Sequence, residues 1–296
     1  MQALWMLAAA LFFASMGVCV KFGSAYMHSF ELVFYRGIVG MVFMGFMART
    51  LGVSLRTTVP SMHLWRTIIG TFSMASWFYA LAHLPLPTAM TLNYMSSVWL
   101  AAFVVGGALF FGQSRMQQGP LLGTVLASFA GVVLILRPTI EQNQLFAGLV
   151  GLLSGMAAAL AYMQVKALGQ AGEPEARTVF YFSAGTVLVG LAGMMVQGVS
   201  PFVWPGFAWV LPLGVFASLG QWCMTRAYAK GATLLVANLQ YAGIVFAALF
   251  SLILFGDPIT PTGWLGITLI MASGITATIL RARIAPPTQH EEPEER

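Results

Sequence analysis

Val33-Phe34-Tyr35-Arg36 returns as Val179-Phe180-Tyr181-Phe182, about 145 residues further along the chain. Other short stretches return at nearly the same distance: Ser76-Trp77 as Gln221-Trp222, Leu109-Phe110-Phe111-Gly112 as Ile253-Leu254-Phe255-Gly256, Gly131 as Gly274, and Leu136-Arg137 as Leu280-Arg281. Each copy contains an odd number of apolar runs of membrane-spanning length. The second copy therefore enters the membrane from the opposite side, which predicts two halves related by a pseudo-two-fold axis in the membrane plane.

The composition predicts that the membrane is the solvent of this chain. Only 8% of residues are charged, 58% are hydrophobic, and the mean hydropathy is +0.82, whereas soluble domains carry about a quarter charged residues. The ranges 67–114 and 178–225 contain no Asp, Glu, Lys or Arg, and each can hold two spans of about 20 residues. The net charge of +5 comes from scattered Lys and Arg, which gives no indication of nucleic-acid binding.

The predicted fold class is an all-α integral membrane protein with ten transmembrane helices, arranged as two inverted-topology five-helix repeats over 1–137 and 146–281. Charges, Pro and Gly separate the expected helices, which cover 3–22, 30–48, 62–83, 87–110, 118–137, 146–166, 177–197, 207–227, 233–255 and 262–281. The first run lacks a preceding Lys or Arg and exceeds the length of a signal core, so we expect it to be retained. Residues 282–296 are too polar to bury and are expected to form a disordered cytoplasmic tail.

The distribution of Lys and Arg predicts the orientation. With a cytoplasmic N-terminus, the inner side carries Arg49, Arg56, Arg66, Arg115, Lys166, Arg177, Arg226, Lys230, Arg281, Arg283 and Arg296, and the outer side carries Lys21, Arg36 and Arg137. This excess follows the positive-inside rule. It predicts a multi-pass protein of a bacterial-type inner membrane with both termini in the cytoplasm.

Residues for enzymatic chemistry are scarce. His28, His63 and His83 lie near predicted span ends, His290 lies in the tail, and no metal-hydrolase, serine-hydrolase or phosphate-loop motif is present. Cys19 and Cys223 are single residues inside apolar segments, which favours a packing role over a disulfide or a metal site. The sequence therefore predicts no enzyme, no cofactor and no metal.

Polar and aromatic residues recur on equivalent helices of the two copies. Asn93 and Ser97 are four residues apart and share a helix face, as do Asn238 and Tyr241 at a spacing of three. A buried amide needs a partner, so these faces point either toward a central polar cavity or into interhelical hydrogen bonds without a ligand role. The candidate solute-binding residues are Trp77, Tyr79, Asn93, Tyr94, Ser97, Trp99, Gln221, Trp222, Asn238 and Tyr241, together with Arg36.

Arg36 lies about two turns into the second predicted span, five residues after Glu31, and its repeat equivalent is Phe182. It either snorkels or pairs with Glu31 to anchor the helix end, or it attracts a carboxylate of a solute. No Asp or Glu lies near the predicted bilayer midplane, where exporters of lipophilic cations keep a carboxylate. A neutral, zwitterionic or anionic solute held by aromatic, amide and hydroxyl groups is therefore favoured.

The second copy resembles a known family. The stretch from Gln240 to Leu249, Gln-Tyr-Ala-Gly-Ile-Val-Phe-Ala-Ala-Leu, closing with Leu254-Phe255-Gly256-Asp257-Pro258, resembles the signature of EamA-like domains in the drug/metabolite transporter superfamily, and Arg226-Ala227-Tyr228-Ala229 also fits. The first copy, from Phe78-Tyr79-Ala80-Leu81-Ala82 to Phe111-Gly112-Gln113, departs further, because the family usually has Glu where Gln113 and Asp257 stand. The resemblance implies a ten-helix inner-membrane carrier with a central cavity lined by its helices one, three, four, six, eight and nine. Members of this kind move amino acids, other metabolites, vitamins or drugs.

The sequence thus predicts a secondary transporter that moves a small polar or amphipathic metabolite, such as an amino acid or an aromatic solute, by alternating access. We expect a monomer in the lipid bilayer, because one chain already contains both repeats. An exporter of lipophilic cations is the first alternative. A membrane scaffold without transport activity, or a membrane enzyme, is the second.

Overall fold

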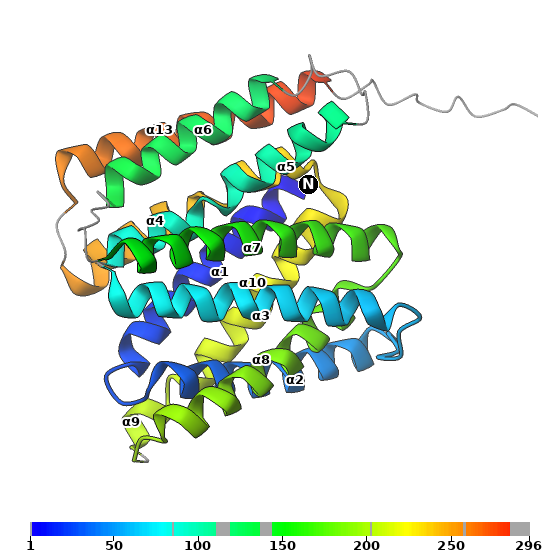
Figure 1. Ribbon diagram of the computed structural model, residues 1–296, viewed down its shortest axis with the longest axis vertical. Coiled ribbons are helices and arrows are strands. Elements are labelled where there is room, and N and C mark those ends of the chain that lie inside the picture. Colours follow the sequence, from blue (N-terminus) through cyan, green and yellow to red (C-terminus); the bar gives the residue numbers. More distant parts are fainter. Residues whose placement is uncertain are drawn as a thin grey trace, which may run out of the picture.

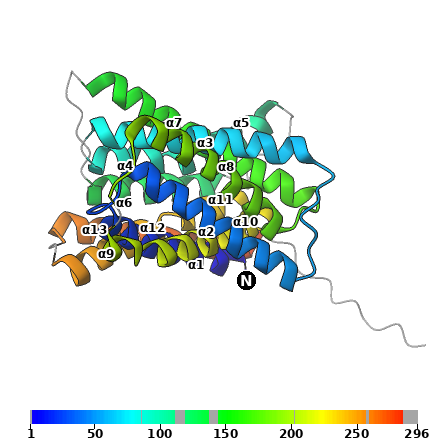
Figure 2. The same cartoon turned by 90° about the horizontal axis from the view of Figure 1, so that it is seen from below.

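The computed structural model describes residues 2–84, 86–110, 119–136, 144–201, 203–256 and 259–284, and within these ranges the regular structure is entirely helical (Figure 1). The elements are α1 (Gln2–Gly23), α2 (Ser29–Thr50), α3 (Pro60–His83), α4 (Leu86–Tyr94), α5 (Ser96–Phe110), α6 (Gly119–Leu136), α7 (Leu145–Gln170), α8 (Glu175–Gln197), α9 (Trp204–Phe207), α10 (Val210–Lys230), α11 (Thr233–Leu239), α12 (Ala242–Phe250), the π-helix η2 (Ser251–Phe255) and α13 (Pro261–Ile284). In Figure 1 α3 and α7 run across the view, and α1 and α10 cross them obliquely; Figure 2 shows the same helices from below.

Seven helical segments of the described chain are long and apolar enough to cross a membrane. They cover 3–23, 29–50, 145–170, 175–197, 204–230, 233–254 and 261–280, and two shorter apolar segments cover 89–104 and 119–135. Large apolar side chains on their outer faces are exposed, among them Val42, Phe46 and Leu188. Such exposure suits contact with lipid rather than water. The predicted number of ten spans is not established by these segments and stays a prediction.

Two of the predicted spans are interrupted. The segment expected at 87–110 is divided at Met95 into α4 and α5, and the segment expected at 233–255 is divided at Gln240 and Tyr241. At the other expected spans the helices differ from prediction mainly at their ends, and α13 continues to Ile284. The rest of the predicted tail, and Arg115, Arg137, Gln113 and Asp257, lie outside the described residues.

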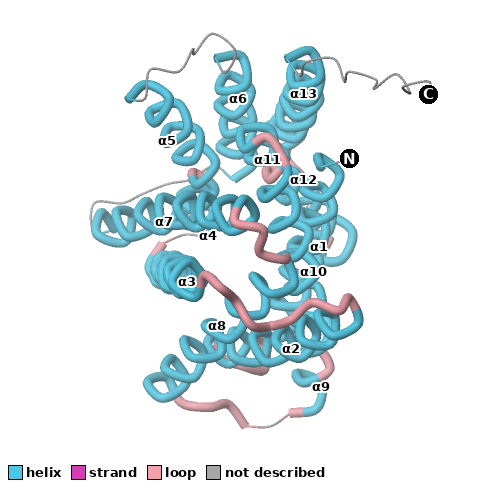
Figure 3. Tube along the Cα trace, turned by 90° about the vertical axis from the view of Figure 1, so that its right-hand side faces the viewer, coloured by secondary structure: helices cyan, strands magenta, loops and turns pink. Residues whose placement is uncertain are grey.

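Helix packing relates the two copies. The most extensive contacts join α2 to α8, α6 to α13, α3 to α7 and α1 to α10. In the repeat, α1 is equivalent to α7, α2 to α8, α3 to α10, and α6 to α13. The α3–α7 contact of one copy is therefore equivalent to the α10–α1 contact, and the α2–α8 and α6–α13 contacts each join a helix to its own equivalent. Figure 3 looks along the helices and shows α3 lying between α7 and the α2–α8 pair.

Small residues set the distance between some of these helices. A Cβ atom placed on Gly155 of α7 would lie 2.5 Å from the carbonyl oxygen of Leu92 on α4, so these two helices approach closely. At Gly119 and Gly123, which have the same four-residue spacing, a Cβ atom would meet no described atom within 4 Å. Short spacing between glycines permits a close helix contact but does not create one.

Candidate functional site

The two helix interruptions fall at equivalent positions of the repeat. Met95 separates α4 from α5, and Gln240 with Tyr241 separates α11 from α12. Around the second interruption the backbone tightens, since the N–H groups of Tyr241 and Ile244 bond to carbonyl groups three residues earlier, at 3.1 and 3.0 Å. Gln240 and Tyr241 keep right-handed helical φ and ψ angles, and residues 233–254 still form one membrane-length segment.

Five of the predicted site residues gather at these interruptions. The rings of Tyr94 and Tyr241 lie 6.2 Å apart, and Ser97 Oγ donates a 2.9 Å hydrogen bond to the carbonyl of Ala237 in the other copy. Interhelical hydrogen bonds also hold Asn93, whose Nδ2 lies 3.4 Å from Ser154 Oγ. This region is therefore one polar junction between the two repeats.

Asn238 belongs to the same junction and is almost fully buried. Its Oδ1 accepts a 2.9 Å hydrogen bond from Ser128 Oγ. Its Nδ2 has no partner in the described part of the chain. An unpaired buried amide donor is unfavourable unless water or a ligand satisfies it.

Gln240 connects the junction to α7 and α10. Its Oε1 accepts a 2.9 Å hydrogen bond from the hydroxyl of Tyr228, and its Nε2 donates to the hydroxyl of Tyr162 at 3.2 Å. The rings of Tyr162 and Tyr228 are stacked with centroids 5.1 Å apart. Sequence reasoning did not select Tyr162 or Tyr228 as site residues, although Gln240 opens the stretch that resembles the EamA-like signature.

Among the other predicted site residues, Trp99 and Trp222 pack against the same core cluster as Tyr94 and Tyr241. Trp222 packs edge-on against Trp5 at 5.2 Å beside Arg226, and Trp99 stacks on Phe103 of its own helix at 6.2 Å. Tyr79 is 39% exposed and stacks on His83. Trp77 of α3 and Gln221 of α10 are partly buried. Whether any of these residues binds a solute stays a prediction.

Two arginines lie within the helix bundle. Arg36 of α2 is partly buried, and Arg66 of α3 is only 4% exposed. The guanidinium carbon of Arg66 lies 4.2 Å from the ring centroid of Phe182, and Arg36 and Tyr162 are its electrostatic neighbours. The side chain of Arg66, which the count of Lys and Arg assigns to the inner side, therefore turns into the protein. The pairing of Arg36 with Glu31 is not formed, since both oxygens of Glu31 bond elsewhere.

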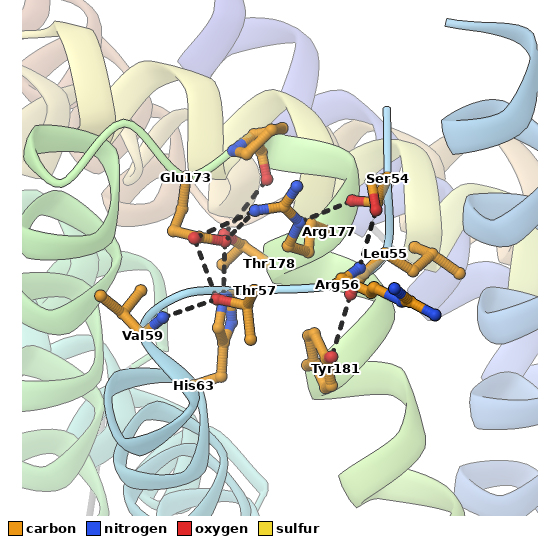
Figure 4. A network of polar contacts seen from close by, with 11 residues as sticks. Ser54, Leu55, Arg56, Thr57, Val59, His63, Glu173, Arg177, Thr178 and Tyr181 are labelled. Carbon is orange, nitrogen blue, oxygen red and sulfur yellow. Dashed lines mark hydrogen bonds and ion pairs between the residues drawn. The ribbon is translucent and has the colours of Figure 1, made fainter. Parts of the chain in front are cut away.

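A buried carboxylate holds the loop after α2 (Figure 4). Glu173, in the turn before α8, accepts hydrogen bonds from His63 Nε2 at 2.8 Å, from Thr57 Oγ1 at 2.9 Å and from Arg177 at 3.0 Å. Burial raises the pKa of the Glu173 carboxyl, but the hydrogen bonds from these three side chains outweigh it and leave the pKa below its ordinary value. Arg177 also donates to the carbonyl of Ser54 at 2.7 Å.

A second carboxylate holds the segment after α8. Glu31, in the first turn of α2, accepts 2.9 and 2.6 Å hydrogen bonds from the backbone N–H and the hydroxyl of Ser200. Hydrogen bonds thus hold the α2–α8 pair together at both ends. Glu31 at the start of α2 binds the segment after α8, and Glu173 before the start of α8 binds the segment after α2. These two networks position the bundle on which Arg36 and Phe182 lie.

The described residues contain no group of three or more His, Cys, Asp or Glu side chains that could hold a metal ion. Cys19 and Cys223 are buried and unpaired. The polar groups around the helix interruptions are the amides and hydroxyls of Asn93, Ser97, Asn238, Gln240 and the nearby tyrosines.

Comparison with known proteins agrees with this architecture. The model of the EamA-like transporter family matches residues 1–137 and 145–279. The chain is 34% identical over 242 residues to the pseudopaline exporter of Pseudomonas aeruginosa, covering 81% of this chain and 82% of that one. It is 24% identical over 279 residues to a riboflavin transporter of Rhizobium johnstonii, covering 92% and 89%.

A crystal structure of similar fold superposes with a TM-score of 0.81 at 19% identity, covering 96% of this chain and 99% of the other. The family and the relatives point to the transport of small molecules rather than to enzymatic activity. Together with the apolar helices, they make this chain a multi-pass membrane protein. The protein belongs to the EamA-like transporter family.

Proposed function

We propose that this chain is a secondary transporter that moves a small polar or amphipathic metabolite across a bacterial-type inner membrane by alternating access. The observation that carries the proposal is the pair of helix interruptions at equivalent positions of the two repeats, with Asn93 and Tyr94 at one and Asn238 and Tyr241 at the other. In carriers built from inverted repeats, the solute site lies at the interface of the two repeats.

The proposed architecture has ten spans in two inverted five-helix repeats, 1–137 and 146–281. In this count α4 with α5, α9 with α10, and α11 with α12 and η2 each form one span. The exchange of the α3–α7 and α10–α1 contacts between the copies supports this arrangement. Both termini would be cytoplasmic, and one chain would be sufficient for transport because it contains both repeats.

The residues at the junction suit a solute with an aromatic or otherwise amphipathic body. Tyr94 and Tyr241 present rings to each other, and the unpaired Nδ2 of Asn238 supplies a donor. Aromatic faces bind apolar or planar groups, while a few amide and hydroxyl groups fix the orientation. Relatives that carry pseudopaline or riboflavin are consistent with amphipathic cargo.

The test is solute flux in proteoliposomes that contain the purified full chain. Radiolabelled aromatic amino acids, aromatic carboxylic acids and riboflavin are loaded in turn, and both uptake and release are followed. We expect saturable flux of at least one solute, reduced at least tenfold by Asn238→Ala and by Asn93→Ala, a loss that corresponds to about 1.4 kcal/mol of lost binding. Thr276→Ala on the exposed face of α13 should leave flux unchanged. Flux that never saturates, or that both asparagine variants leave intact, would contradict the proposal.

A further inference from the structure

Arg66 is a buried cation with hydrogen-bond donors that have no acceptor. Its side chain is only 4% exposed, and its Nε and Nη1 have no hydrogen-bond partner in the described part of the chain. Its one close aromatic contact is Phe182, whose ring centroid lies 4.2 Å from the guanidinium carbon. A ring face attracts the cation but accepts no conventional hydrogen bond in the guanidinium plane. The donors in that plane therefore need another partner.

The direction of the Arg66 side chain excludes simple anchoring at a helix end. Side chains of an α-helix normally lean toward its N-terminus, and an arginine near that end extends its head outward to reach water. The Nη1 atom of Arg66 instead lies against Gly70, one turn further into α3. The missing side chain at Gly70 leaves room for the guanidinium, which points toward the interior of the bundle rather than toward Pro60.

No negative charge in the described residues balances this cation. Its electrostatic neighbours are the hydroxyl of Tyr162 and a second cation, Arg36. Each acid of the described ranges has partners of its own: Glu31 binds Ser200, Glu173 binds His63 and Arg177, and Glu175 lies 3.5 Å from Lys230. A buried cation without a counter-ion is unfavourable inside a protein, so this place lacks an anion.

The fold itself does not require the two charges. The repeat equivalent of Arg36 is Phe182, and at the spacing of about 145 residues the equivalent of Arg66 is Leu211. The second copy therefore builds the same helices with apolar residues at both places. Charges that only one copy carries, with Arg66 almost fully buried and Arg36 partly buried, point to a function of the site rather than to the architecture.

We infer that Arg66 binds the carboxylate group of the transported solute, an inference that rests on the proposed transport function. A planar guanidinium matches a carboxylate with two parallel charge-assisted hydrogen bonds, and the ring of Phe182 holds its plane. Tyr162 is an electrostatic neighbour of Arg66 and accepts a 3.2 Å hydrogen bond from Gln240 at the helix interruption. The solute class is an amphipathic organic acid whose carboxylate meets Arg66 while its body lies toward the tyrosines.

The test measures binding without transport. The purified full chain is placed in phosphatidylcholine nanodiscs, and its thermal unfolding is followed with benzoate and with benzamide, which has a similar shape but no charge. Variants are Arg66→Met and Arg66→Lys, and the matched control is Arg56→Met in the exposed loop after α2. We expect benzoate, and not benzamide, to raise the Tm of the wild type and of the control. Arg66→Met should weaken benzoate binding at least tenfold, and Arg66→Lys should fall between because it keeps the charge but loses the planar fork.

A second readout separates a binding role from a structural one. Without any anion, Arg66→Met should leave the Tm unchanged or raise it, since the substitution removes an unbalanced buried charge. A lower Tm would show that Arg66 supports the fold, and the inference would be wrong. It would also be wrong if benzoate stabilised the wild type and Arg66→Met equally, or if benzamide acted as well as benzoate.

The source of the anion and the proposed function are tested by further arms. If chloride, phosphate or added phosphatidylglycerol stabilises the chain through Arg66 while benzoate does not, Arg66 binds an inorganic ion or a lipid headgroup. The carboxylate proposal then fails. Saturable flux of an uncharged solute that needs no Arg66 overturns this inference and leaves the transport function intact. Benzoate binding that depends on Arg66, in a protein without any saturable flux, overturns the transport function instead.

Discussion

Nε2 of His63 lies 2.8 Å from Oε2 of Glu173, and both side chains are buried although they come from different repeats. The ionised carboxylate can only accept hydrogen bonds, so His63 donates to it, as do Thr57 and Arg177. The loop after α2 is thereby fixed to the turn before α8 (Figure 4). This contact joins α3 to the α2–α8 pair at one end of the bundle.

Glu173→Gln should destabilise the fold. The amide removes the negative charge, weakens the bonds from Arg177 and His63, and places an N–H donor opposite other donors. Loss of a hydrogen bond to a charged partner costs about 1.5–3 kcal/mol. The measurement is the Tm in detergent, with Glu175→Gln as the control, because Glu175 faces the exposed Lys230 at 3.5 Å and such pairs contribute about 1 kcal/mol or less. Equal effects of the two substitutions would contradict a special role of Glu173.

The same carboxylate predicts how stability depends on pH. The pKa of Glu173 is lowered from its ordinary value of 4.5 in the folded protein, so the folded state binds this proton less readily than the unfolded state. The stabilisation is complete above pH 4.5 and is lost as the pH falls from there through the lowered pKa. In Tm measurements from pH 7 to pH 3, the wild type should approach Glu173→Gln at the acid end. A constant difference between the two proteins over this range would contradict the assignment.

The repeat made much of the helix order accessible from sequence, because apolar length and the spacing of charges report directly on membrane-sized helices. The interruptions at Met95 and Gln240–Tyr241 were not accessible. Neither segment contains an internal Pro, and residues such as Met and Tyr are tolerated in helices, so local propensity gives no sign of a break. Tertiary contacts between the two copies fix the backbone there instead.

The candidate site was predictable where residue type and repeat position agreed, as for Asn93, Tyr94, Asn238 and Tyr241, which the structure brings to one junction. The inward direction of Arg66 was not predictable, since its six-residue distance from the start of α3 also suits a surface charge. Only the room beside Gly70 and the ring of Phe182 turn it inward. Sequence distance carries no information on such contacts between repeats.

Gly155→Ala should separate α7 from α4. The added methyl group would lie 2.5 Å from the carbonyl oxygen of Leu92 and 3.3 Å from that of Asn93, and neither backbone atom can move without moving its helix. Overpacking of this kind costs about 1–3 kcal/mol. Gly123→Ala is the matched control, since nothing lies within 4 Å of its added methyl group and alanine favours a helix by about 1 kcal/mol. We expect a lower Tm for the first variant and an equal or higher Tm for the second; the reverse order would disprove the contact.

Tyr228→Phe should destabilise the protein through one hydroxyl group. Tyr228 is fully buried, and its hydroxyl donates a 2.9 Å hydrogen bond to Oε1 of Gln240. Phenylalanine keeps the stacking on Tyr162 but leaves this oxygen without its donor, which costs about 1–3 kcal/mol for a buried group.

The control for this prediction is Tyr26→Phe, because Tyr26 is 41% exposed and its hydroxyl makes no hydrogen bond within the described chain. Thermal unfolding should show a lower Tm for Tyr228→Phe alone. If the two variants have the same Tm, Gln240 must find another donor, and the hydroxyl of Tyr228 does not fix it.

Tyr228→Phe should also affect transport. Since Gln240 forms the interruption between α11 and α12, its carboxamide without the bond from Tyr228 should change the apparent KM of any solute that binds there, with a smaller effect on the maximal rate. An altered Tm with an unaltered KM would place Gln240 in the framework of the bundle and outside the solute site.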